Sequence, residues 1–507
     1  FSIKPNEEFK FLAKPILYPI IAMSLILLAF VFWFTKSSNF WSHFPGLSRF
    51  KDVSFEDAGL QPRLIALRAA WQGFLEKPIT GWGFENFNVP YNAHYDPEAL
   101  TISYQETRFD KPHNLFFEVI VSGGVLLGFA FIYLFIAFIF RLIKNGDQLW
   151  KSIGLAILVA YCVRSFFVFD TIGPVMMLYL VFAYSVSGQV NDGFLKKEKE
   201  EFKKVISKPL LLGSLAMGLI FIYFFNWRPT LASNYQYWGF INFVKGDSPA
   251  AIQSFEKAIH SGMFYGYYFV RDYAGAIAET YFFRPETVDK EDVARVLGMM
   301  EKVTKEHPKD AYNHYALADM YNQVSDIDPE RLLALAEKEE YMALELSPDR
   351  QQIYFSLAKT KHLQGKKQEA LEIAKKALDL NPNASEGYFY YGVLAFDLNM
   401  PEAGYQSLKK AMELGRRWKT AQELLTVANF FADSNHLEEA LDLYIKALDM
   451  EPNNLEIRAK LGAAYFFLGN SEMARQELMQ VMEKIDITKS PAYPFYYQIL
   501  RDLGLVN

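Results

Sequence analysis

The sequence predicts an all-α protein, in which a multispanning transmembrane helical bundle of about five spans is followed by an α-solenoid outside the cytoplasm. The chain is 51% hydrophobic and holds 45 Phe, yet its mean hydropathy is near zero, so an apolar part and a water-soluble part must average out. Apolar stretches of spanning length lie in the first half only, and helical repeats follow them. We therefore expect a membrane domain at 1–226 and a repeat domain at 227–507.

The apolar stretches approach or exceed the roughly 20 residues that a helix needs to cross a bilayer. They lie near 13–34, 114–141, 152–169, 172–189 and 209–226. The connector with Arg141, Lys144 and Lys151 is basic, and the one from Lys196 to Lys208 is rich in Lys, so both should face the cytoplasm. This topology predicts a multi-pass protein of the cytoplasmic (inner) membrane, in contact with membrane lipids. The loop at about 36–113 and the repeats then lie on the same, outer side.

Composition and missing motifs exclude several functions. A net charge of -6 without a basic face gives no reason to expect nucleic acid as a partner. The one cysteine, Cys162, rules out an intrachain disulfide and a cysteine zinc site. The sequence shows no Walker loop, His-Glu-x-x-His motif, Gly-x-Ser-x-Gly elbow or redox motif, so we expect neither a metal nor a cofactor. Because the chain begins at Phe1 without a signal peptide, we expect it to be the C-terminal part of a longer protein.

The external loop begins with an amphipathic helix that starts at Arg63 and ends before Pro78. A tight turn, Gly81-Trp82-Gly83, follows. Guanidinium groups suit a lipid diphosphate because they offer permanent charge and paired donors. At about 100° per residue, however, Arg63 and Arg68 lie roughly 140° apart, so a straight helix cannot aim both at one phosphate. Either arginine is alternatively a solvated or snorkelling charge.

Pro112-His113-Asn114 lies at the mouth of the apolar stretch that contains Gly123, Gly124 and Gly128. With an ordinary pKa near 6.5, a histidine there can accept a proton at neutral pH. The alternative is an interfacial polar residue, with Asn114 as a helix cap. Glu118, about one turn later, either orients the imidazole of His113 or faces the bundle interior, and the glycines indicate close helix packing.

Two further groups have mainly structural interpretations. Arg164 lies in an apolar run, where pairing with Asp170 would relieve its cost. Tyr91, His94 and Tyr95 form a polar aromatic cluster that we interpret as a plug within the loop, with sugar stacking as the alternative.

After residue 227 the sequence repeats with a period of about 34 residues. In the frame from Gln351, small or apolar residues recur at set positions, and Pro382 closes the unit; they are Tyr354, Leu357, Ala358, Ala370, Ala374 and Ala377. This pattern resembles the tetratricopeptide repeat, and only the region from Ser325 to Pro329 interrupts it. Stacked repeats present a concave surface, so we expect them to hold a protein partner or an acceptor.

Between Arg63 and Gly128 the sequence resembles the O-antigen ligase and polymerase superfamily of membrane glycosyltransferases. The resemblance rests on the arginine-started helix, the turn from Pro78 to Gly83, and Asp110-Lys-Pro-His113-Asn114 before a glycine-containing helix. It implies a metal-independent enzyme that takes a glycan from an undecaprenyl-diphosphate carrier on the outer face of the membrane. It also implies a glycan, lipid or protein acceptor, as in surface polysaccharide assembly or protein O-glycosylation.

The same resemblance implies roles for individual residues. Arg63, with Arg68 as its substitute, would bind the diphosphate, and His113 would activate the acceptor hydroxyl or steady the leaving diphosphate. Gly81, Gly83 and Asn114 would contact the substrate. The chain departs from the family's Gly-x-x-Gly pattern because three residues separate Gly124 from Gly128. A non-enzymatic, membrane-anchored repeat scaffold for envelope assembly is the alternative function.

Overall fold

The structure is a computed structural model, and the residues that it describes contain helices and turns but no β-strand. It describes residues 27, 30–32, 34–36, 38–43, 60–102, 107–145, 148–166, 171–187, 208–261, 266–416, 418, 420–485 and 493–506. The chain divides into two compact units, 1–65 and 66–507.

The first unit contains a short 3₁₀ turn at Asn39–His43. The turn is fixed by Trp41, which is buried and whose indole N–H donates to Thr35 Oγ1 over 2.9 Å. The edge of the Trp41 ring also meets the ring of Phe32, with 5.0 Å between centroids. The span expected near 13–34 lies mostly outside the described residues.

Within residues 60–102, the loop contains three α-helices. Helix α3, Gln61–Glu76, confirms the predicted amphipathic helix that ends before Pro78. Two short helices follow, α4 at Asn88–Ala93 and α5 at Ala99–Ile102. A Cβ on Gly73 of α3 would lie only 2.5 Å from Pro90 Cβ of α4, so these two helices cross in close contact.

The apolar part of the second unit contains helices of unequal length, α6 (Leu115–Asn145), α7 (Gln148–Ser165), α8 (Ile172–Ser187) and α10 (Lys208–Ile222). Within the described residues, one helical stretch, Leu115–Lys144, is long and apolar enough to cross a membrane. Helix α8 is only 16 residues long, which at 1.5 Å per residue gives about 24 Å against a hydrocarbon core of about 30 Å. The apolar helix expected near 114–141 is therefore confirmed as long enough to span, whereas the expected number of five spans is not confirmed.

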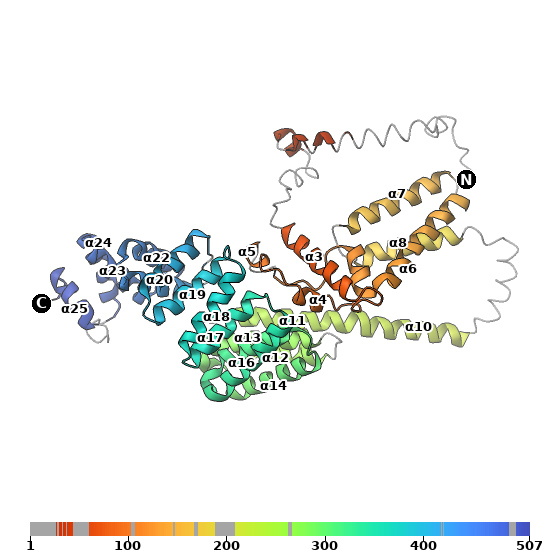
Figure 1. The fold of residues 1–507 in the computed structure, drawn as a ribbon. Helices are drawn as coiled ribbons and strands as arrows, with labels where there is room; N and C mark the ends of the chain where they lie inside the picture. Colours follow the sequence, from red (N-terminus) through yellow and green to blue (C-terminus); the bar gives the residue numbers. More distant parts are fainter. Residues whose placement is uncertain are drawn as a thin grey trace. The chain divides into compact units, whose positions relative to one another are not determined.

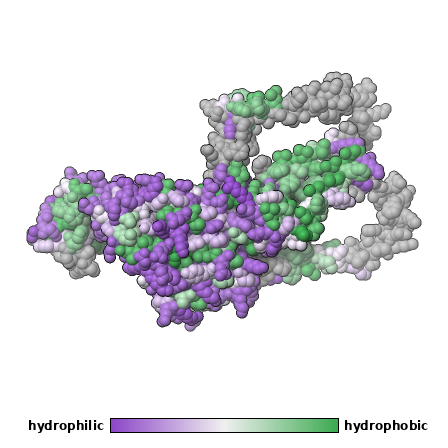
Figure 2. All heavy atoms as spheres, in the orientation of Figure 1, coloured by the Kyte–Doolittle hydropathy of each residue, from purple (hydrophilic) through white to green (hydrophobic). Residues whose placement is uncertain are grey.

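Helices α6, α7 and α8 pack on one another through a common apolar cluster that includes Phe138, Leu158 and Leu178. Their outer faces leave large apolar side chains exposed, among them Phe129 and Tyr133 of α6 and Met177 of α8. Figure 2 shows these apolar surfaces over α6 to α8, whereas the repeat helices are mostly hydrophilic. Such an outward apolar surface fits a lipid environment.

Helix α10 continues into the repeat helices without a loop. A π-helical turn at Tyr223–Trp227 joins it to α11, Arg228–Val244, and the residues on both sides of the turn keep right-handed helical backbone. The domain boundary predicted after residue 226 falls inside this helical run and stays a prediction.

The repeat region consists of consecutive antiparallel helix pairs, which Figure 1 shows following one another from α11 to α24. The first pairs are α11 with α12 (Ser248–His260), α13 (Gly266–Phe283) with α14 (Lys290–Glu306), and α15 (Ala311–Gln323) with α16 (Pro329–Leu346). They are followed by α17 (Gln351–Leu363) with α18 (Lys367–Leu380), α19 (Ser385–Asp397) with α20 (Pro401–Glu413), α21 (Ala421–Asp433) with α22 (Leu437–Met450), and α23 (Leu455–Phe467) with α24 (Ser471–Met482). Helix α25, Tyr493–Asp502, comes last.

Small residues at the repeated positions allow this close pairing, as the sequence predicts. Ala358 and Ala374 are fully buried between paired helices. A Cβ on Gly392 would lie 2.8 Å from Leu408 Cγ, so a larger residue there would force the Leu408 side chain or the helices to shift. The irregular region becomes a short 3₁₀ turn at Ser325–Ile327. Asp328 caps the helix that follows by accepting a hydrogen bond from Arg331 N.

A carboxyl group lies buried among three repeat helices. The side chain of Glu340 accepts hydrogen bonds at Oε1 from Ser356 Oγ (2.5 Å), Thr360 Oγ1 (2.8 Å) and Asn322 Nδ2 (3.2 Å). Burial raises the pKa of Glu340 to about 7, although these hydrogen bonds act to lower it.

We expect the stability of the protein to fall as the pH rises from 4.5 to about 7. The raised pKa means that the fold binds this proton more tightly than the unfolded chain, so the stability is fully present below the ordinary pKa of 4.5 and declines toward 7. The pKa difference corresponds to at most about 3 kcal/mol. Thermal unfolding of the full chain in detergent, compared with Glu340→Gln, measures this effect. An equal decline in the variant would assign the pH dependence to other groups.

Candidate functional site

The Gly81 turn docks against a break in helix α6. At Gly124 the backbone leaves the helical region, with φ 62° and ψ -161°. In an unbroken helix the carbonyl oxygens of residues 121 and 122 would accept from the amides four residues later. Here Val121 O accepts from Trp82 N at 2.9 Å, and Ser122 O accepts from Gly83 N at 2.8 Å. The turn therefore replaces the helix bonds that the break removes.

The amide of Val125, on the other side of the break, donates to Pro78 O at 2.8 Å. A Cβ on Gly124 would lie 2.2 Å from Ile79 O, and a Cβ on Gly81 would lie 2.4 Å from Ser122 O. Both glycines also have positive φ. The lack of a side chain at Gly81 and Gly124 thus allows the backbone of the turn to contact the backbone of α6 directly. The predicted glycine packing exists at this point, but the partner is the turn rather than a second helix.

Trp82 ties the same turn to α3. Its indole N–H donates to Gly73 O over 2.8 Å, and Lys77 Nζ lies 3.6 Å from the centre of its ring. Helix α3, the turn and α6 are therefore linked through one residue and its backbone. The substrate contacts predicted for Gly81 and Gly83 stay a prediction, because the contacts observed for these two residues are structural.

His113 stands directly before α6 with its backbone in the left-handed region, at φ 54°. This conformation costs a non-glycine residue about 1–2 kcal/mol, and such strain is concentrated at functional sites. The His113 side chain is half-buried, and the edge of the Phe109 ring meets it with 5.4 Å between ring centres. The structure thus holds the predicted histidine in an enforced geometry.

Asn114 caps α6 and is buried. Its Oδ1 accepts from Phe116 N at 3.0 Å and Phe117 N at 3.2 Å. Its Nδ2 donates to Phe166 O at the end of α7, over 3.0 Å. The cap interpretation of Asn114 is confirmed, and the substrate contact predicted for this residue stays a prediction.

Charged groups gather beside His113. Lys111 Nζ lies 2.9 Å from Glu85 Oε1 and 3.6 Å from Glu118 Oε1. Burial acts to lower the pKa of Lys111, but the hydrogen bond to Glu85 and the charge of Glu118 outweigh it and raise this pKa. Glu118 thus contributes to an ion-pair cluster at the mouth of α6.

The two candidate arginines lie in different surroundings. Arg68 is paired with Asp96, with 3.4 Å between Nη1 and Oδ2, and its side chain is 64% exposed. Arg63 lies in the first turn of α3, within the unit 1–65, and is half-buried. Arg164 donates to Thr171 Oγ1 over 3.4 Å, and its predicted partner Asp170 lies outside the described residues.

The aromatic cluster of the loop forms a core, as the plug interpretation predicts. Tyr91 and Tyr95 are buried, and Tyr91 OH donates to Thr107 O over 3.4 Å. Burial raises the pKa of Tyr91 above its ordinary value. His94 Nε2 lies 2.9 Å from Glu76 Oε1, which fastens the loop to the end of α3.

The loop core also contacts the repeat helices, which the sequence does not predict. Arg350 is buried and donates to Thr107 O over 3.1 Å and to Asn92 Oδ1 over 2.8 Å. Asn381 Nδ2 donates to Pro97 O over 3.0 Å. The sequence feature that could have indicated this contact is that Arg350 and Asn381 both lie in turns between repeat helices, at the edge of the solenoid, where a neighbouring segment can pack.

Comparison with known families decides the class of the first domain. The family model described as O-antigen ligase matches residues 7–133. Residues 7–133 carry an O-antigen ligase domain. Tetratricopeptide repeat models match residues 351–384 and 431–486. The combination of a ligase with tetratricopeptide repeats that the sequence suggests is therefore confirmed.

Among curated proteins, the chain is 28% identical over 133 residues to the BBSome complex member BBS4 of Bos taurus, a match that covers 26% of this chain. The chain spans about a quarter of this relative, because the match covers 25% of its length. A thermophilic TPR protein of Thermus thermophilus is 22% identical, with 35% of this chain and 92% of that chain covered and a TM-score of 0.29. The PilF protein of Pseudomonas aeruginosa is 16% identical, with 46% and 99% covered and a TM-score of 0.36.

The O-antigen ligase domain includes both candidate arginines, the Gly81 turn, His113 and the break in α6. The general reaction of this family is glycan transfer at a membrane, and the apolar helix α6 fits that location. No group of three His, Cys, Asp or Glu side chains that could hold a metal ion occurs in the part of the chain that the structure describes.

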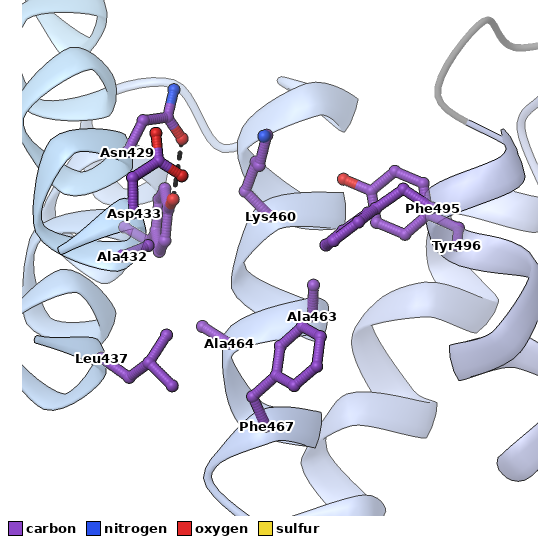
Figure 3. Close-up of a pocket in the computed structure, with 11 residues that line it drawn as sticks. Asn429, Ala432, Asp433, Leu437, Lys460, Ala463, Ala464, Phe467, Phe495 and Tyr496 are labelled. Carbon is purple, nitrogen blue, oxygen red and sulfur yellow. Dashed lines mark hydrogen bonds between the residues drawn. The ribbon is translucent and has the colours of Figure 1, made fainter. Parts of the chain in front are cut away.

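A separate cavity of about 510 Å³ lies in the last repeats, between α21, α22, α23 and α25. Figure 3 shows its polar groups, Asn429, Asp433 and Lys460, around an opening that is bordered by Phe467 and Phe495. Tyr444 OH donates to Asn429 Oδ1 over 2.7 Å at its wall. Every residue that lines the cavity belongs to the repeat region and not to the O-antigen ligase domain.

We expect Gly81→Ala and Gly124→Ala to prevent normal folding of the O-antigen ligase domain. Each adds a Cβ that collides with backbone and demands positive φ, which alone costs about 1–2 kcal/mol. Melting temperature and monodispersity in detergent measure the effect. Gly128→Ala in the same helix is the matched control, because its Cβ would meet only Ile120 Cγ2 at 3.3 Å. Melting of Gly124→Ala at the temperature of this control would contradict the docking of the turn.

Proposed function

We propose that this protein transfers or polymerises a glycan from an undecaprenyl-diphosphate carrier onto an acceptor at the outer face of the cytoplasmic membrane. The observation that carries the proposal is the strained His113 inside the segment that matches the O-antigen ligase family. It stands at the mouth of the apolar helix α6, where a lipid-linked donor and a water-soluble acceptor meet. The acceptor is a glycan, a lipid or a protein hydroxyl.

The proposed topology places the loop and the repeats together outside the cytoplasm. Hydrogen bonds from the repeat residues Arg350 and Asn381 to loop residues support a common side, since a membrane between them would forbid such contacts. The basic connector after α6 supports a cytoplasmic location for the opposite end of that helix.

In the proposed reaction, the acceptor hydroxyl oxygen attacks the anomeric carbon of the lipid-linked sugar. The new carbon–oxygen bond forms as the bond from that carbon to the diphosphate oxygen breaks, and the diphosphate leaves with the electron pair. The neutral imidazole of His113 takes the hydroxyl proton. A guanidinium group balances the charge that develops on the leaving diphosphate, so the step needs no metal.

Arg63 is the arginine that we assign to the diphosphate. Arg63 lies in the first turn of α3, where the resemblance places the family arginine, and is half-buried, whereas the side chain of Arg68 is 64% exposed and its charge is well hydrated. The Lys111 cluster beside His113 adds fixed charges that would orient the substrate at the mouth of α6.

A non-enzymatic scaffold is the second candidate function, and the tetratricopeptide repeats favour it. Repeats of this type bind proteins through their surfaces, so a protein partner at the repeats is compatible with both functions. The cavity between α21 and α25 is one place where such a partner would fit. Loss or retention of glycan transfer separates the two functions.

We expect His113→Ala to reduce glycan transfer by about 100-fold or more, since general base catalysis contributes on this scale. The measurement is transfer from a lipid-linked glycan by the purified full chain, with surface glycan in cells as a second readout. His260→Ala is the matched control, because this histidine lies in the repeat helix α12, where its Nδ1 is 2.8 Å from Glu256 O, and has no proposed role in the reaction. Undiminished glycan transfer by His113→Ala, at a normal protein level, would contradict the catalytic role of His113.

We also expect the two arginines to differ. Arg63→Ala should raise the KM for the lipid-linked donor and lower kcat, because the charge on the diphosphate grows toward the transition state. Arg68→Ala should change both constants much less, as its guanidinium is exposed and paired with Asp96. Steady-state kinetics with varied donor concentration distinguish the variants. A larger defect in Arg68→Ala than in Arg63→Ala would instead assign diphosphate binding to Arg68.

A further inference from the structure

The contact between the repeats and the external loop has a buried arginine at its centre. Arg350 lies in the turn between α16 and α17 and is only 6% exposed. Its guanidinium donates to Thr107 O and Asn92 Oδ1, and it lies 4.1 Å from the centre of the Tyr95 ring. A planar group with several fixed donors holds such a set of acceptors in one arrangement. Arg350 therefore joins two separate segments of the loop to the repeats.

Polar and apolar contacts surround Arg350. Gln351 Nε2 donates to Pro97 O over 3.4 Å, and Asn381 Nδ2 donates to Pro97 O over 3.0 Å and to Thr101 Oγ1 over 3.4 Å. Leu100 of the loop packs in a buried cluster with Phe355, Ala377 and Ala384 of the repeats. An apolar patch with direct hydrogen bonds beside it is typical of a specific interface rather than of an incidental contact.

The repeats also hold Arg108, the residue after Thr107. The Arg108 guanidinium lies 4.5 Å from the centre of the Tyr312 ring in α15, and the buried Arg271 of α13 lies 4.6 Å from the same ring. The repeats thus hold two successive loop residues, Thr107 through its carbonyl and Arg108 through its side chain.

From this contact a continuous row of rings leads to His113. Tyr95 meets Tyr91 with 6.1 Å between ring centres, Tyr91 meets Phe109 with 5.4 Å, and Phe109 meets His113 with 5.4 Å. The backbone gives a second link, because Thr107 O accepts from both Arg350 and Tyr91. The strained backbone at His113 persists only if its surroundings determine it fully.

We propose that Arg350 is a positioning residue for the transfer reaction, which holds the loop core so that His113 faces the acceptor. The inference rests on the proposed function and extends the site into the repeat domain. The repeats then do more than recruit a partner: the turn before α17 completes the site.

Arg350→Gln in the full chain tests the proposal, and Arg416→Gln is the matched control. Arg416 is likewise a buried arginine in an inter-helix turn, 3.7 Å from the centre of the Phe389 ring, and it bonds to Glu386 and Glu423 within the repeats. Arg350→Lys keeps the positive charge beside Tyr95 but loses the paired donors, so it should fall between wild type and Arg350→Gln.

Two readouts are combined. Amide hydrogen exchange in segment 107–114 should become about tenfold faster in Arg350→Gln and stay unchanged in Arg416→Gln, because only the former releases charge-assisted hydrogen bonds to the loop. Steady-state kinetics should show a kcat about tenfold lower in Arg350→Gln, with the KM for the lipid-linked donor unchanged.

Unchanged exchange in segment 107–114 of Arg350→Gln would overturn the proposal, and so would an equal loss of kcat in Arg416→Gln. The exchange readout does not depend on glycan transfer. Full transfer by His113→Ala would therefore refute the proposed function, whereas the exchange result tests whether Arg350 holds the loop core.

Discussion

Backbone hydrogen bonds exchanged between the Gly81 turn and the break in α6 are the constraint on which the rest of the site depends. A carbonyl or amide without a partner in apolar surroundings costs several kcal/mol, so a helix that crosses such surroundings rarely breaks. Here the break frees groups on both sides of Gly124, and the turn satisfies Val121 O, Ser122 O and Val125 N. The short part of α6 before Gly124, which follows His113, is thereby fixed against α3.

The repeat domain adds a second constraint from the opposite side of the loop. Each helix pair buries its apolar face only against its neighbours, which gives a stiff but extended structure. The loop core of Tyr91, Tyr95 and Phe109 packs between the start of α6 and the repeats. Long-range contacts therefore stabilise the loop and His113 in addition to the local sequence. This arrangement explains how a loop with few regular elements carries a residue at positive φ.

Local patterns allow much of the fold to be predicted from the sequence. The end of α3 before Pro78, the apolar helix after His113 and the repeat frame around Ala358 and Ala374 each follow from spacing within a short window. The number of spans does not, since Lys151 and Arg164 interrupt the apolar character of α7 and α8 is short.

The candidate site is predictable only in part. His113 and the glycines stand out by residue type. Gly81 and Gly124, however, allow a contact between two backbone segments, which no periodic pattern in the sequence indicates. Arg350 is separated from Thr107 by more than two hundred residues and looks like any polar residue in a turn between repeats. Such long-range hydrogen bonds depend on the three-dimensional course of the chain, which a single sequence does not reveal.

The unbroken helical run from α10 into α11 has a consequence for how the repeats can change in evolution. The helix pairs from α11 to α16 form a spacer of fixed length between the end of α10 and the turn that holds Arg350. Adding or deleting one pair within this spacer would carry Arg350 away from the loop by the height of a whole repeat. Among the described residues, the cluster around Leu100 of the loop extends to Ala384 and Tyr390, directly before and within α19, so the number of repeats is free to vary only in the pairs that follow α20.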